Sequence, residues 1–159
     1  MADRPGTMTF YRREGEEVFR LESATLTAFR HPEGIELFFC VRAKKGPERP
    51  LPGAADLRVR PNAEVSVFVQ KFDPATLAGS RFEVPRSYDE EREDHVSCVY
   101  YHEHQDLNRI VVEVIARKGK RFHVRWTGTT NDIDNYDGSE PQNRLVIEGM
   151  FEFQGIEEA

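Results

Sequence analysis

The chain has 159 residues, of which 38% are hydrophobic and 31% charged, and its formal net charge is −6. That length suits one domain with a single core, and the composition excludes a largely disordered chain. No run approaches the roughly 20 apolar residues of a membrane helix. The opening stretch MADRPGTMTFYRREGEE contains no apolar segment of the signal-peptide kind. We therefore expect a cytoplasmic protein that does not enter a membrane.

The charge is unevenly distributed along the chain. Residues 1–80 carry 12 Lys and Arg against 11 Asp and Glu, whereas residues 81–159 carry 10 against 17. Nucleic-acid binding through counterion release needs a basic face. The basic run 117-RKGKR-121 is typical of an ordinary hairpin tip. The sequence therefore argues against a nucleic-acid partner.

Alternation of apolar and polar residues is the dominant pattern, and it predicts strands over 35–41, 65–70 and 145–153. The nearly continuous apolar run 110–116 predicts a strand that is covered on both faces. Gly149 interrupts the inward-facing set of the last strand, which indicates a bulge or a close approach of another backbone.

The segments between these runs are rich in turn residues, and we expect loops over 44–56, 85–95 and 129–143. The only helical segment predicted is 73-DPATLAG-79, where Asp73 caps one or two turns. A single open sheet of this size would expose a face and two edges. The pattern therefore favours one all-β domain over residues 1–159, an antiparallel β-sandwich or flattened barrel of about eight or nine strands.

The strand register of two hairpins can be predicted, because the apolar residues of a buried face must all lie on the same side of the sheet. A loop at 31–34 places six of them on one face, in the pairs Ala28–Leu37, Leu26–Phe39 and Ala24–Val41. A three-residue loop at 118–120 gives Ala116–Phe122, Val114–Val124 and Val112–Trp126, and sets Glu113 opposite Arg125. We expect the second hairpin in the interior of a sheet, with Trp126 and Val112 facing the core.

Cys40 and Cys98 lie in apolar strand-like runs, FFCV and VSCVYY. In the expected compartment they are predicted to be two reduced thiols in the core, and apolar surroundings raise the pKa of a thiol and do not activate it. The chain has no nucleophile, phosphate-loop or dinucleotide motif. The sequence thus favours a protein that is not an enzyme.

The acidic stretch 131-NDIDNYDGSE-140 is one candidate metal site, through Asp132, Asp134 and Asp137. It fails the EF-hand pattern, because counting from Asp132 places aspartate and not glycine at the sixth position. Two interpretations stay open: a looser Ca²⁺ site, or a polar turn in which Asn, Asp and Gly serve the backbone.

His102 and His104 form the second candidate metal site. Residues two apart on a strand face the same way, so the pair could hold one transition metal. The cupin His-x-His pattern requires a following Glu and bracketing glycines, which are missing here. The alternative is a pair of exposed histidines near a strand end.

Four aromatic or branched residues lie opposite the main apolar sets, and they cover either a second packed layer or a partner surface: Phe38, Phe68, Val99 and Tyr101. Taken together, the sequence predicts a non-enzymatic binding module that takes a partner protein or a small ligand through loops at one end. The alternative is a metal-dependent enzyme or metal-binding protein. No cofactor is expected, apart from a possible divalent cation.

Overall fold

The structure is a computed structural model, and it describes residues 5–12, 15–49, 58–101, 103–131 and 143–159. The strands described are β1 Gly6–Arg12, β2 Gly15–His31, β3 Gly34–Ala43, β4 Asn62–Val69, β5 Arg81–Val84, β6 Tyr88–Asp89, β7 Asp94–His95, β8 Ser97–Tyr100, β9 His104–Gln105, β10 Asn108–Lys118, β11 Arg121–Thr130 and β12 Asn143–Glu158. One 3-10 turn, η1, covers Pro74–Thr76. Within the described part of the chain, no helix is long and apolar enough to cross a bilayer.

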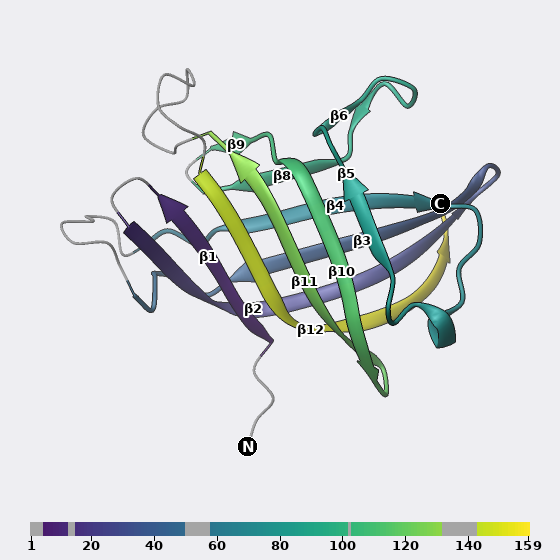
Figure 1. Cartoon of the computed structure of the whole chain (residues 1–159), viewed down its shortest axis with the longest axis horizontal. Helices are drawn as coiled ribbons and strands as arrows, with labels where there is room; N and C mark the ends of the chain where they lie inside the picture. Colours follow the sequence, from purple (N-terminus) through teal and green to yellow (C-terminus); the bar gives the residue numbers. More distant parts are fainter. Residues whose placement is uncertain (1–4, 13–14, 50–57, 102, 132–142) are drawn as a thin grey trace.

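Ten strands form one sheet in the order β5-β10-β11-β12-β1-β2-β3-β4-β8-β9, and β6 and β7 form a separate hairpin. The long strand β12 pairs first with β11 and β1, and its last part runs parallel to β2. The sheet folds over itself, so that β1, β12, β11, β10 and β5 cross above β2, β3 and β4 (Figure 1). The all-β prediction is confirmed. The strand count is higher than eight or nine because β6, β7 and β9 are two-residue strands without an apolar pattern.

The core fills the space between the two layers of this sheet. Its largest side chains are fully buried, among them Trp126, Phe10, Phe39, Phe122 and Phe151. The rings of Phe39 on β3 and Phe151 on β12 lie 6.0 Å apart and join the layers. Each such side chain contributes about 1.5–3 kcal/mol by leaving water, so packing of the two layers is the main source of stability.

The first predicted hairpin register is confirmed, because all three expected apolar pairs of β2 and β3 are present. The second is confirmed at Val112–Trp126, Glu113–Arg125 and Val114–Val124. It is wrong nearer the turn, where Ala116 lies opposite His123 and not Phe122. A bulge at Ile115 absorbs the odd residue within the strand, and the turn keeps two residues, with Gly119 at a φ of 61°. A positive φ at the first turn position suits a type II′ hairpin.

Two local predictions are also confirmed. Gly149 lies directly opposite Gly6 of β1, and a Cβ built there would come within 1.8 Å of the Pro5 carbonyl oxygen. The glycine therefore marks a close approach of two backbones. The short helical turn begins after Asp73, whose carboxylate accepts a hydrogen bond of 2.9 Å from the backbone N–H of Ala75.

Candidate functional site

The folded sheet closes on itself at one point, where two buried serines connect β8 to the chain that follows β5. The Ser87 hydroxyl donates to the carbonyl oxygen of Ser97 at 2.5 Å, and the Ser97 hydroxyl donates to that of Leu107 at 2.6 Å. The Val96 N–H also donates to the Ser87 carbonyl at 2.7 Å. Buried hydroxyls need such partners, and here the partners are backbone carbonyls that hold the seam together.

Beyond this closure β4 and β5 separate, and a cavity of about 400 Å³ lies between them. We call it the seam slot. Its lining combines the end of β4, the end of β5 and the segment that leads into the β6–β7 hairpin: Ser66, Val67, Phe68, Glu83, Val84, Pro85, Arg86, Tyr88, Asp89, Glu90 and Val96. Apolar side chains of the sheet thus form its floor, and charged ones stand around it.

Both walls of the seam slot are free strand edges. Strand β8 pairs with β4 from Asn62 as far as Val65, and the Ser66 N–H makes the last contact by donating to the Val96 carbonyl. Main-chain groups alternate between the two edges of an antiparallel strand. The N–H and C=O of Phe68 therefore point into the slot, where the described residues offer no strand partner. By the same alternation, Glu83 of β5 points its main chain toward the slot and away from β10.

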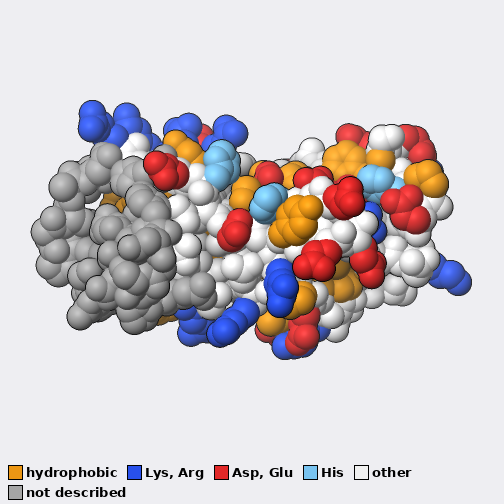
Figure 2. Space-filling view, turned by 90° about the horizontal axis from the view of Figure 1, so that it is seen from above, with side chains coloured by type: hydrophobic (Ala, Val, Ile, Leu, Met, Phe, Trp, Pro, Cys, Tyr) orange, Lys and Arg blue, Asp and Glu red, His pale blue; other side chains and the backbone are white. Residues whose placement is uncertain are grey.

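The rim of the seam slot is acidic. The charged residues in its lining are Glu83, Asp89, Glu90 and Arg86. The segment 81–94 carries six carboxylates and three arginines, and two of these arginines form ion pairs, Arg81 with Glu83 and Arg92 with Asp89. On the face that carries the β6–β7 hairpin, acidic side chains gather on the half away from the grey residues (Figure 2). Arg86 and Glu90 are both exposed, and neither has an ion-pair partner among the described residues. Charged groups of this rim are therefore available to a ligand.

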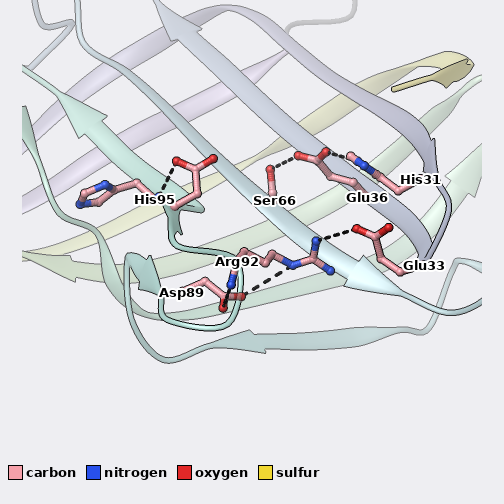
Figure 3. Close-up of polar contacts among 8 residues, drawn as sticks. His31, Glu33, Glu36, Ser66, Asp89, Arg92 and His95 are labelled. Atoms are coloured by element: carbon pink, nitrogen blue, oxygen red, sulfur yellow. Dashed lines mark hydrogen bonds and ion pairs between the residues drawn. The ribbon is translucent and has the colours of Figure 1, made fainter.

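Arg92 fastens the β6–β7 hairpin beside the slot. Its guanidinium lies 3.2 Å from the centroid of the Phe68 ring, and it forms ion pairs with Glu33 at 3.5 Å and Asp89 at 3.8 Å (Figure 3). Cation–π contacts of this kind contribute about 0.5–2 kcal/mol. The arginine thus joins three parts of the chain: the hairpin, the end of β4 and the β2–β3 turn.

A Ser–Glu–His chain lies next to this arginine, on the outer face of β3 and β4 (Figure 3). The Ser66 hydroxyl donates to Glu36 Oε2 at 2.6 Å, and Glu36 Oε1 lies 2.8 Å from His31 Nε2. In a Ser–His–Asp triad the histidine contacts the serine hydroxyl and takes its proton, whereas here the carboxylate stands between the serine and the histidine. The arrangement positions Glu36 and does not activate Ser66.

The two cysteines lie on the outer face of the sheet, both free and half-buried, so the prediction that they belong to the core is wrong. Cys40, Glu64 and Cys98 occupy facing positions on β3, β4 and β8. Burial, followed by the Glu64 charge, raises the pKa of the Cys98 thiol to about 12. Burial and Glu64 also raise the pKa of Cys40, against a smaller lowering by Arg42. Neither thiol is activated for nucleophilic chemistry.

The opposite end of the core contains buried polar groups. The Tyr101 hydroxyl donates to Glu17 Oε1 at 2.7 Å, and Glu17 is only 1% exposed. Thr130 and Asn143 face each other across β11 and β12, and both are buried. Within the described part of the chain, Thr130 Oγ1 and Asn143 Nδ2 have no hydrogen-bond partner. The indole nitrogen of Trp126 also lacks one. None of these groups belongs to the lining of the seam slot.

The structure does not test the metal sites considered from sequence, because most of their residues lie outside its described part. His104 is exposed on β9, and its ring lies 5.1 Å from that of Tyr100. His102 lies outside the described residues, and so do Asp132, Asp134 and Asp137. Among the residues that are described, no three His, Cys, Asp or Glu side chains come close enough to hold a metal ion.

The sequence left open whether Phe38, Phe68, Val99 and Tyr101 cover a second packed layer or form a partner surface. Val99 and Tyr101 are buried in the core, whereas Phe38 and Phe68 lie on the outer face. The sequence does not reveal the seam slot, because it places Arg86 and Ser87 in the predicted loop 85–95. The available signal was local: 85-PRSYDEERED-94 begins with proline and then carries charge on both sides of a tyrosine.

No family model, no curated protein and no solved structure matches this chain in the three comparisons made.

Proposed function

We propose that this protein is a non-enzymatic binding module that holds a small ligand or a segment of a partner protein in the seam slot. The observation that carries the proposal is the slot itself, a cavity of about 400 Å³ between two free strand edges. Ligand sites are typically concave and mostly apolar, with a few polar groups that fix orientation. Val67, Val84 and Pro85 supply the apolar part, and Arg86 and Glu90 the charged part.

The remaining polar clusters support binding over catalysis. Ser66 donates to a carboxylate and Cys98 has a raised pKa, so neither is placed as a nucleophile. We further propose a cytoplasmic location, which is supported by two free thiols. If His102 and His104 instead form a metal site, protein purified without a histidine tag should contain zinc, iron or manganese near one equivalent. We expect less than about a tenth of an equivalent.

The proposal is tested by mapping a small-molecule fragment set on the protein with amide chemical shifts. Binders should shift the amides of Val67, Phe68 and Glu83 together. Val84→Trp should fill the slot and abolish these shifts. Val146→Trp, the same exchange on a half-buried residue of β12 outside the slot lining, is the matched control and should leave them intact. Shifts that avoid the slot, or that survive Val84→Trp, contradict the proposal.

A further inference from the structure

We propose that the occupant of the seam slot is an extended peptide segment with alternating apolar and basic residues, which pairs as an added strand with the free edge of β4. This inference rests on the proposed function, since it names the class of ligand for the same slot. Three features of the slot carry it: its free main-chain groups, its apolar floor and its acidic rim.

The main-chain groups determine that the ligand is a strand. Phe68 presents an N–H and a C=O to the slot, and Glu83 presents the same pair from the opposite wall. An extended peptide between them satisfies both walls, which is the recognition mode in which a partner strand completes an open sheet edge. A compact small molecule offers few groups at the strand repeat of about 3.3 Å per residue.

The floor and the rim determine the side chains. Successive residues of a strand point to opposite faces, so alternate residues of the peptide face the floor formed by Val67 and Val84. The other residues face the rim, where the lining contributes three carboxylates against one arginine and the whole segment 81–94 carries six carboxylates against three arginines. Arg92 is already engaged with Phe68, Glu33 and Asp89. The excess negative charge therefore selects lysine or arginine at the alternate positions.

The probe is a fluorescein-labelled heptapeptide of alternating lysine and valine, and its binding is followed by anisotropy at low ionic strength. A peptide with glutamate in place of lysine tests the charge. A lysine peptide that is N-methylated at alternate residues tests the main-chain bonds, because methylation removes donors without changing charge. We expect only the unmodified lysine peptide to bind.

Charge-reversal variants locate the site. Glu83→Lys with Glu90→Lys should weaken the lysine peptide by roughly tenfold or more and admit the glutamate peptide. Glu157→Lys, on β12 and outside the slot lining, is the control and should leave binding unchanged. Equal binding of the glutamate or N-methylated peptide, or an equal loss in the Glu157 variant, overturns the inference. If fragments shift the slot amides but the peptide does not bind, the peptide inference is wrong and the proposed function stands. If neither the fragments nor the peptide bind, the proposed function is wrong as well.

Discussion

Replacing Gly149 with alanine should push the amino-terminal strand β1 away from β12. A Cβ at this position would lie 1.8 Å from the Pro5 carbonyl oxygen, 2.8 Å from the Pro5 carbonyl carbon and 3.0 Å from Gly6 Cα. These contacts are all with backbone, which cannot rotate aside as a side chain can. The same Pro5 oxygen accepts a hydrogen bond of 2.7 Å from the Met150 N–H, so relieving the clash breaks that bond.

The size of the effect follows from these two losses. Forcing extra atoms into a packed site costs about 1–3 kcal/mol, and the lost hydrogen bond adds about 1 kcal/mol. Together they predict that the free energy of unfolding falls by about 2–4 kcal/mol. For a domain of this length, each kcal/mol lowers Tm by about 2–4 °C. The expected fall in Tm is therefore roughly 4–16 °C.

The assay is urea unfolding followed by the fluorescence of Trp126, the only tryptophan, which is fully buried in the folded state. Gly119→Ala is the matched control, because it adds the same methyl group at a position with no atom within 4 Å. Its positive φ of 61° should cost about 1 kcal/mol. A Gly149→Ala variant as stable as the Gly119→Ala variant would show that β1 does not approach β12 as described.

Three further outcomes are expected. Alkylation of Cys98 by iodoacetamide should still be rising with pH above 9, because burial and Glu64 raise its pKa to about 12. Glu64→Gln should lower that pKa and speed alkylation at pH 9, and an unchanged rate would show that the carboxylate does not act on the thiol. The raised pKa also stabilises the fold below pH 9 and loses this contribution as pH rises toward 12. Emission from Trp126 should be blue-shifted in the native state, and emission already at the unfolded wavelength would place the indole in solvent. Millimolar Ca²⁺ should shift Tm no more than Mg²⁺ does, and a calcium-specific rise that disappears in Asp134→Asn with Asp137→Asn would establish a cation site in that loop.

The parts of the fold that could be predicted are the hairpins whose register follows from the alternation of apolar and polar residues. The β2–β3 hairpin follows from alternation alone, because one register puts Leu26, Leu37 and Phe39 on the same face. The β10–β11 hairpin shows the limit of that reasoning. Alternation correctly paired Val112 with Trp126, but it could not decide whether the extra residue lies in the turn or in a bulge at Ile115. Both choices keep the core residues together, and turn geometry decides between them.

The seam slot could not be predicted because it depends on strands that are distant in sequence. Its walls, β4 and β5, are consecutive in the chain but lie at different places in the sheet order, separated by six other strands. The residue pattern of 65–70 or 81–84 does not indicate that the facing edges of β4 and β5 stay unpaired. Ser87 and Ser97, whose hydroxyls donate to backbone carbonyls across the closure, likewise look like ordinary loop and strand residues in the sequence.

The central claim is that the edges of β4 and β5 are open to a ligand. Hydrogen exchange at two pairs of neighbouring amides tests this claim most directly. In the free protein the amides of Phe68 and Glu83 should exchange rapidly. Those of Val67 and Phe82, one residue away, should be protected by their bonds to β3 and β10. Adding the lysine–valine peptide should protect Phe68. Protection of Phe68 and Glu83 equal to that of their neighbours in the free protein would mean that the slot is closed and the account is wrong.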